Sequence, residues 1–340
     1  MSIGPGSTPQ SMRSGPGRRV HLATALLAAA SLMLAGCGGD DSPAAPQAAS
    51  TWPMTGLPVS GDASAEQSYP VLVTKVDNTP ASAPQVGLGE ADLVVEELVE
   101  GGLTRLAAFY YSRLPSSVGP VRSMRASDIG IVAPVEASIV TSGAAPQTIA
   151  RIEDAGITFY TEGSDGISRD SSRSAPYNVF ADLATIAESA KQEEARPADY
   201  LPWSSEDTLP QGKPAKEIAA SFGGGHTTTW TFDGEGYVNE NSYAAAGDDF
   251  PADTVLVLKV EIVDAGYLDP AGNPVPETNL TGTGDAMIFH GGRVVRGTWR
   301  KDSVDAPITL SKESSDLTVP AGHVWIELVP ADLGDVTFEE

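Results

Sequence analysis

The sequence has few of the residue types that build most metal and redox sites. Its 340 residues include one cysteine and four histidines, so no disulfide can form within the chain and a zinc site of the usual ligands is not expected. We find no HExxH helix, no GxSxG nucleophile turn and no glycine-rich phosphate loop. We therefore predict that the protein uses neither a metal nor a cofactor.

Positive charge is also scarce, because 21 basic residues stand against 45 acidic ones. Removing residues 1–36 as a signal would leave 18 basic and 45 acidic residues, a net charge of −27. A domain of this charge repels the phosphate backbone of nucleic acids and anionic lipid headgroups. We therefore expect no nucleic-acid partner.

The beginning of the chain has the pattern of a bacterial lipoprotein signal. Three arginines (Arg13, Arg18 and Arg19) precede the apolar run Leu22–Leu34, which at about 13 residues is too short to span a bilayer. The sequence "LAGC" then ends at Cys37, the single cysteine of the chain. We predict a signal peptide over 1–36, a lipidated Cys37, and anchoring at the outer face of the cytoplasmic membrane.

Composition and periodicity divide the rest of the chain. Residues 37–67 are rich in Gly, Ser, Pro, Ala and Asp, as in a flexible tether. Residues 68–196 alternate β-branched runs with helical patterns, 197–217 are Pro-rich, and 218–340 show almost only strands and turns. We predict an α+β protein: a mixed α/β N-terminal half with a sheet and flanking helices, a linker, and a smaller β-rich C-terminal module.

The stretch "EELVEGGLTRLAAFYY", residues 96–111, predicts a β-hairpin. A two-residue turn at Gly101 and Gly102 would pair Leu98 with Arg105, which places Glu96, Glu100 and Arg105 on one face. A helix is expected to begin at Ser123, so that Arg122 and Arg125 point toward this face.

Together with neighbouring loops, this hairpin gathers most of the candidate binding residues. We expect Arg105 to be a buried partner of the glutamates, and Arg122 and Arg125 to face a ligand. The candidates are Asp77, Asn78, Glu96, Glu100, Arg105, Arg122, Ser123, Arg125 and Asn178.

Two functions fit this set. The first is a binding or scaffolding protein, whose arginines hold a carboxylate or phosphate of a cell-wall glycan or of an envelope protein. The second is a hydrolase of a wall polymer with Glu96 or Glu100 as acid or base. A purely structural ion-pair network is the third interpretation, so the sequence leaves open whether the protein is an enzyme.

Long stretches of the chain resemble the YerB-type family of bacterial lipoproteins. In the first half these are "TGLPV", "KVDNTPASAPQVGLGEADLVVEELVEGGLTRLAAFYYS" and "VGPVRSMR"; in the second, "GTGDAMIFHGGRVVRGTWRK" and "VPAGHVWIELVP". The resemblance covers about residues 57–330, and implies a two-part domain of unknown function and an envelope location. Where the family leads us to expect a His-Asn pair after a proline, this chain has Pro176, Tyr177 and Asn178, and where we expect a His-x-Gly-Gly-Ser loop it has "VTSGAAPQ".

Overall fold

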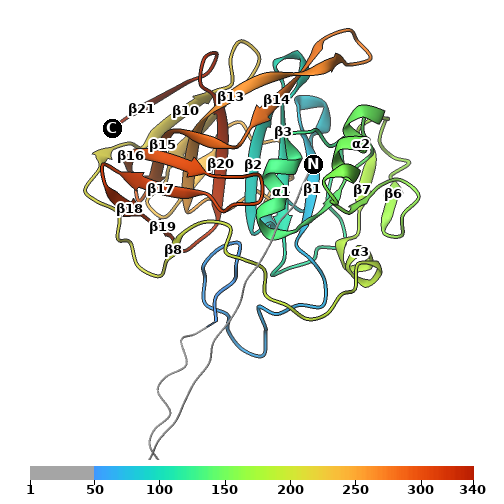
Figure 1. The fold of residues 1–340 in the computed structure, drawn as a ribbon, viewed down its shortest axis with the longest axis horizontal. Helices are drawn as coiled ribbons and strands as arrows, with labels where there is room; N and C mark the ends of the chain where they lie inside the picture. The colour runs from blue at the N-terminus through green and yellow to red at the C-terminus, as the bar shows by residue number, and fades with distance from the viewer. Residues whose placement is uncertain (1–49) are drawn as a thin grey trace, which may run out of the picture. The chain divides into compact units, whose positions relative to one another are not determined.

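A computed structural model describes residues 50–340, so Cys37 and the predicted signal lie outside the described part (Figure 1). The α-helices of this part are α1 (Asp128–Val132), α2 (Pro146–Asp154) and α3 (Leu183–Ser189). Four 3-10 turns accompany them: η1 (Pro80–Ser82), η2 (Leu88–Glu90), η3 (Glu100–Gly102) and η4 (Ala133–Val135). The strands are β1 (Leu72–Asn78), β2 (Leu93–Leu98), β3 (Thr104–Tyr110), β4 (Ser138–Val140), β5 (Phe159–Tyr160), β6 (Ile167–Arg169), β7 (Val179–Ala181), β8 (Trp203–Ser204), β9 (Lys213–Pro214), β10 (Glu217–Ser221), β11 (Thr227–Phe232), β12 (Tyr237–Asn239), β13 (Thr254–Leu268), β14 (Pro274–Asn279), β15 (Gly282–His290), β16 (Arg293–Lys301), β17 (Thr309–Lys312), β18 (Ser315–Leu317), β19 (Val319–Pro320), β20 (Val324–Pro330) and β21 (Asp335–Glu339).

One mixed sheet of 13 strands runs through the described residues, and it contains both halves of the sequence. Its order is β18-β17-β16-β15-β13-β20-β2-β3-β1-β4-β5, with β14 and β9 added beside β13 and β16. Strand β20, from the C-terminal half, lies parallel to β13 on one side and to β2 on the other. Figure 1 shows the red β20 next to the cyan β2 at this junction. The two halves are therefore hydrogen-bonded to each other in the middle of the sheet.

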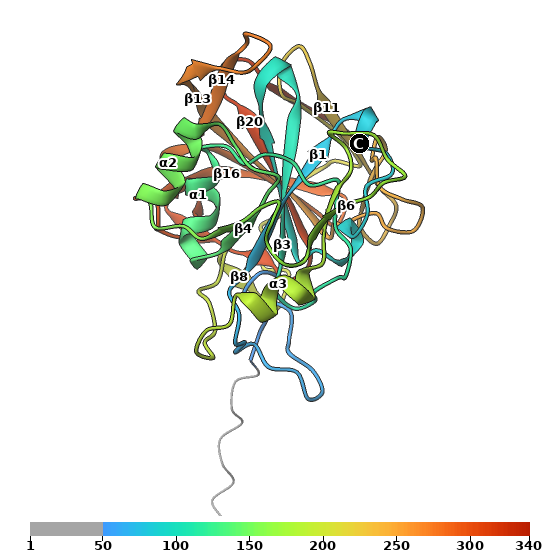
Figure 2. The ribbon, with the colours of Figure 1, turned by 90° about the vertical axis from the view of Figure 1, so that its right-hand side faces the viewer.

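The central strands are buried on both faces, which explains their nearly continuous apolar sequences. Every residue of β1, β2, β3 and β20 is buried. One face packs against residues of α1 and α2, and the other packs against α3 and a second sheet in the order β12-β11-β10-β21. Figure 2 shows α1 and α2 on one side of the strands and β11 on the other. Polar side chains on the central strands consequently lie between layers.

The structure contains more strand and less helix than the sequence analysis predicts. The helix predicted from Ser123 begins only at Asp128, so Arg122 and Arg125 lie in the loop before α1 and not on a helix start. The helix α2 begins at Pro146, whose missing N–H and fixed φ suit the first turn of a helix. The β-rich character of the C-terminal half is confirmed, whereas flanking helices are few and short. The Pro-rich segment 197–217 also contributes two short strands, β8 and β9, which pair with β19 and β16.

Candidate functional site: two polar networks on opposite faces of one hairpin

The β2–β3 hairpin differs from the predicted register by one residue. Glu97, and not Leu98, pairs with Arg105. The turn has three residues, Glu100–Gly102, because Gly101 and Gly102 both adopt left-handed conformations with φ of 73° and 71°. A shift of one residue exchanges the faces of a strand, so Glu96 lies on the face opposite Arg105. The prediction that Glu96, Glu100 and Arg105 share one strand face is therefore wrong.

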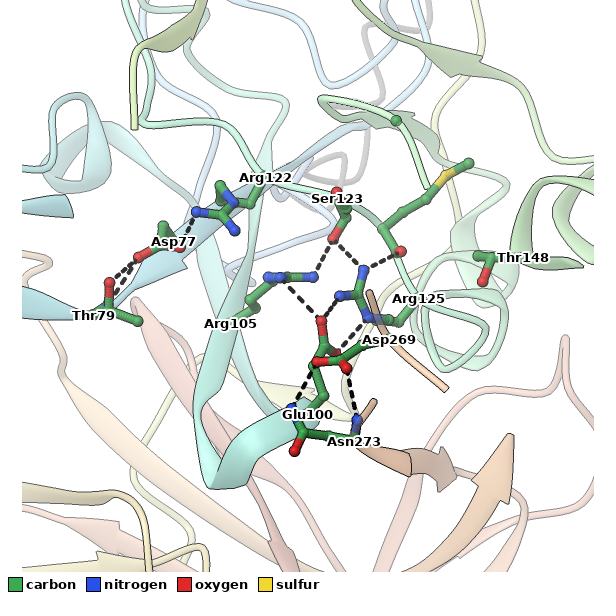
Figure 3. A network of polar contacts seen from close by, with 12 residues as sticks. Asp77, Thr79, Glu100, Arg105, Arg122, Ser123, Arg125, Thr148, Asp269 and Asn273 are labelled. Carbon is green, nitrogen blue, oxygen red and sulfur yellow. Dashed lines mark hydrogen bonds and ion pairs between the residues drawn. The ribbon is translucent and has the colours of Figure 1, made fainter. Parts of the chain in front are cut away.

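Glu100 nevertheless meets two arginines, because it sits in the turn and not in a strand (Figure 3). Arg125 binds its carboxylate in a bidentate manner, with Nε 2.9 Å from Oε2 and Nη2 on Oε1. Arg105 Nη2 lies 3.5 Å from the same Oε1, and Arg105 Nη1 donates to the carbonyl of Ser123 at 2.9 Å. Arg125 is itself buried, contrary to the expectation that it faces a ligand.

Arg122 is placed at the edge of this group by Asp77. Its Nη1 lies 3.0 Å from Asp77 Oδ2, an ion pair without the alignment of a hydrogen bond. The guanidinium also lies over the ring of Tyr177, 5.1 Å from its centre. Of the three arginines, Arg122 has the most exposed side chain, 18% against 8% and 10% for Arg105 and Arg125. We call Asp77, Glu100, Arg105, Arg122 and Arg125 the arginine cluster.

The arginine cluster holds three guanidinium groups and two carboxylates, and its pKa values reflect this imbalance. Burial and then the charge of Arg125 lower the pKa of Arg105 to about 10, with Arg122 contributing in the same direction. Burial opposes the ionisation of Glu100, but the hydrogen bond and charge of Arg125 outweigh it and lower the pKa of Glu100. Glu100 is therefore held ionised, which makes it unsuited to donate a proton.

A second ion group, which the sequence analysis missed, lies on the same face of the sheet as Asp77 and Arg105. Lys75 Nζ is 2.6 Å from Glu97 Oε1 and 2.7 Å from Asp128 Oδ1, and all three side chains are completely buried. We call these residues the Lys75 triad. Asp128 Oδ2 also accepts a hydrogen bond from the backbone N–H of Arg125 at 2.7 Å, so the triad positions the loop that carries the arginines.

Burial raises the pKa of Glu97, although Lys75 opposes the shift, and within the described part of the chain Glu97 Oε2 has no hydrogen-bond partner. The two carboxyl groups of Glu97 and Asp128 thus share a single buried cation, Lys75 Nζ.

The opposite face of the hairpin carries a pair of buried carboxyl groups, Glu96 and Glu327, which are aligned on the parallel strands β2 and β20. Glu96 accepts hydrogen bonds from Asn78 Nδ2 and Thr228 Oγ1, both at 2.9 Å, and its Oε1 lies 3.0 Å from His226 Nε2. Asn78 thus belongs to this face and not to the arginine cluster, because neighbouring residues of a strand point to opposite sides.

The two carboxyl groups have unequal surroundings. Glu327 accepts one hydrogen bond at Oε1, from Trp230 Nε1 at 2.9 Å, and its Oε2 has no hydrogen-bond partner among residues 50–340. Burial and then the charge of Glu96 raise the pKa of Glu327 well above its ordinary value. Burial also opposes the ionisation of Glu96, but the hydrogen bond and charge of His226 lower its pKa. The opposite shifts of the two pKa values favour a proton on Glu327 over one on Glu96.

His226 reaches this pair from the loop between β10 and β11. The preceding Gly225 packs so closely against the carbonyl of Gly102 that no side chain would fit there. The glycines of "GGGH" thus allow one loop to contact the turn of the β2–β3 hairpin. Glu327 and His226 both come from the C-terminal half, far in sequence from Glu96.

The remaining candidate residues have different surroundings. Ser123 contributes its backbone carbonyl to Arg105 and Arg125. Asn178 lies outside the arginine cluster, where its Oδ1 accepts a hydrogen bond from Arg169 at 2.6 Å. Within residues 50–340, no three His, Cys, Asp or Glu side chains are arranged to hold a metal ion.

Comparison with known proteins assigns both halves of the chain to one family. Residues 54–196 match the N-terminal domain of DUF3048, described as a protein of unknown function, and residues 218–326 match its C-terminal domain. The chain belongs to the DUF3048 family. It is 27% identical over 295 residues to a protein of Bacillus subtilis (strain 168) that carries the name lipoprotein YerB, covering 82% of this chain and 86% of that protein.

A solved structure confirms the fold of this DUF3048 protein. The crystal structure of YerB from Bacillus subtilis matches with a TM-score of 0.69 and 22% identity, over 84% of this chain and 99% of that one. The YerB-type resemblance seen in the sequence is therefore confirmed. No helix in residues 50–340 is long and apolar enough to cross a membrane.

Proposed function

We propose that this DUF3048 protein is a lipid-anchored binding protein of the cell envelope, which holds an anionic group of a cell-wall polymer on Arg122. The observation that supports the proposal is the charge balance of the arginine cluster. Glu100 is shared by Arg105 and Arg125, which leaves Arg122 with Asp77 as its carboxylate partner. A partly exposed guanidinium with free donors is suited to a carboxylate or phosphate.

The surroundings of Arg122 favour binding over purely structural pairing. Its guanidinium is fixed between Asp77 and the ring of Tyr177, so little conformational entropy is lost when a ligand binds. The protein is strongly acidic elsewhere, with a net charge of −24 for the full chain. An anionic polymer would therefore be repelled from most of the surface and directed to this group.

Anchoring of the chain rests on Cys37 and on the lipoprotein name of the Bacillus subtilis relative. A Cys37→Ser variant should appear in the medium or keep its signal peptide, whereas the natural chain fractionates with the membrane. If the variant fractionates and migrates like the natural chain, Cys37 is not the anchor.

The binding site can be tested with the unlipidated Cys37→Ser chain and purified cell wall. Arg122→Ala should reduce retention on the wall about tenfold or more, since a hydrogen bond to a charged group contributes ~1.5–3 kcal/mol. Retention should also fall as salt is raised. The matched control is Arg300→Ala, which removes an arginine with a 70% exposed side chain.

Equal retention of Arg122→Ala and the natural chain would contradict the proposal, as would an equal loss in the Arg300→Ala control. Unchanged melting temperatures show that neither variant acts by unfolding the protein. If the protein is still retained after the polymer is removed from the wall preparation, but not after that preparation is treated with protease, the partner is an envelope protein and not the polymer.

A further inference from the structure

A separate cavity of about 430 Å³ lies at the other end of the β2–β3 hairpin, away from its turn. Four distant parts of the chain form its wall: residues 52–63 at the start of the described chain, the ends of the hairpin around Asp92 and Ser112, Pro251 before β13, and His323 just before β20. Its size lies within the ~300–1,000 Å³ of small-molecule sites, which commonly form where segments meet.

The polar groups of this cavity are held in place by the protein. Asp92 is 2% exposed and accepts three hydrogen bonds: Oδ2 from the N–H of Tyr111 at 2.6 Å and of Ser112 at 2.9 Å, and Oδ1 from Ser112 Oγ. A carboxylate offers about four acceptor positions. One position therefore accepts no hydrogen bond from the described residues, and Asp92 is among the residues that line the cavity.

A histidine stands in the same cavity. The backbone N–H of His323 donates to Asp253 Oδ2 at 2.7 Å, and its Nδ1 lies 3.4 Å from the same oxygen. The Asp253 contact orients the imidazole ring and leaves Nε2 for another partner. Glu90 and Arg113, both exposed, add an acceptor and a donor at the rim.

An aromatic ring completes the wall. Trp52 is partly buried, and its ring packs edge-on against Tyr111, with ring centres 6.2 Å apart. The cavity thus combines a fixed aromatic surface with carboxylates, an imidazole and a guanidinium. A sugar ring has the complementary chemistry, because its C–H face is apolar and its hydroxyl groups both donate and accept hydrogen bonds.

We propose that this cavity is a binding site for a neutral sugar residue of a wall glycan, with Trp52 against the ring and Asp92, Glu90 and His323 as hydrogen-bonding partners. Trp52 follows Cys37 by 15 residues, a span of at most about 50 Å when fully extended. With the proposed lipid anchor at Cys37, the sugar must lie close to the membrane. The proposal shares this anchor with the proposed function, but it does not depend on Arg122.

The test is calorimetric titration of the unlipidated Cys37→Ser chain with the trimer of N-acetylglucosamine, and with maltotriose for comparison. The natural sequence should bind at least one of the two trimers. Glu90→Gln changes an exposed side chain and should weaken binding several-fold, whereas Trp52→Ala should weaken it tenfold or more. Arg122→Ala should bind the trimer like the natural sequence.

A second measurement tests the role of Trp52 even if Trp52→Ala does not fold. The protein has five tryptophans, so its indole N–H signals can be followed by NMR. The signal missing from Trp52→Phe is that of Trp52, and it should move when the sugar is added. Absence of heat and of signal shifts with both trimers would overturn the cavity proposal and leave the wall-retention test of Arg122 unaffected. Equal weakening by Arg122→Ala and Glu90→Gln would also overturn it.

Discussion

Replacing Glu327 by glutamine should make the protein more stable at neutral pH, although it alters a completely buried side chain. In the folded state Glu327 keeps its proton, because burial and the neighbouring Glu96 raise its pKa well above the ordinary value of 4.5. In the unfolded state the proton is released near that ordinary value. Between about pH 4.5 and the raised pKa of Glu327 the folded state therefore binds one more proton than the unfolded state, and stability falls by up to about 1.4 kcal/mol per pH unit.

Glutamine has the shape of the protonated acid and can donate to Glu96 as the acid does, but it carries no titrating proton. Urea unfolding at pH 5.5, 6.5 and 7.5 should therefore show Glu327→Gln gaining stability over the natural sequence as the pH rises, by up to about 1.4 kcal/mol per pH unit while the pH stays below the raised pKa of Glu327. The pKa of His226 is also raised, by the hydrogen bond and charge of Glu96 acting against burial, so its contribution is lost as the pH rises through that value. This effect is present in both proteins and cancels in the difference.

The prediction fails if the two stability curves run parallel between pH 5.5 and 7.5. Parallel curves would mean that Glu327 ionises near its ordinary pKa in the folded state, and that the pair with Glu96 does not hold a proton. A constant difference in stability between the two parallel curves would be due to the packing of the new side chain alone. If Glu327→Gln instead lost stability relative to the natural sequence as the pH rises, the effect would have the opposite sign to the prediction and would refute it.

Three further predictions follow from the other side of the hairpin and from the segment between the halves. Lys75→Met should destabilise by about 3–5 kcal/mol in urea unfolding, because it leaves buried carboxyl groups unpaired; a loss below about 1 kcal/mol would contradict the triad. Glu100→Gln should lower the melting temperature more than Arg105→Ala, because it leaves two arginines without their carboxylate. Arg105→Ala leaves the bidentate pair of Arg125 with Glu100 in place and removes a repelling charge. The opposite order of melting temperatures would be evidence against Glu100 as the shared partner. Limited proteolysis should cut first within the largely exposed 197–217 segment, and the two pieces should remain associated through β2 and β20; separation of the pieces without denaturant would count against the shared sheet.

The existence of the hairpin could be predicted from sequence, but its register could not. The apolar runs on either side of Gly101 and Gly102 identify two strands, and glycines identify the turn. A two-residue and a three-residue turn both use glycines with positive φ, so "VEGGL" is compatible with either. The choice depends on Glu100 leaving the strand to meet Arg125, a contact with a loop 25 residues away. Register was therefore decided by tertiary contacts that no local pattern contains.

The buried charges leave a signal in the sequence. Lys75 interrupts the apolar run "VLVTKV", and Glu327 interrupts "VWIELV". A charged residue inside the run of a central strand must be paired or neutral, since an isolated buried charge costs several kcal/mol. The sequence could thus have indicated that Lys75 and Glu327 are special. It could not indicate their partners, because Asp128 and Glu96 come from elements that only the folded sheet brings close.

The separation of the two networks bears directly on the choice between binding protein and hydrolase. Hydrolysis by a pair of carboxyl groups requires one acid and one base that both reach the substrate. The carboxyl pair that has unequal pKa values, Glu96 and Glu327, is 0% exposed on both members and lies between two layers. Glu100 is nearer the surface, but Arg125 and Arg105 hold it ionised and occupied. The carboxyl pair with unequal pKa values thus lies where substrate does not reach, and the most exposed charge of the arginine cluster is that of Arg122, which binds anions without proton transfer. That distribution favours recognition of a ligand over cleavage at this hairpin.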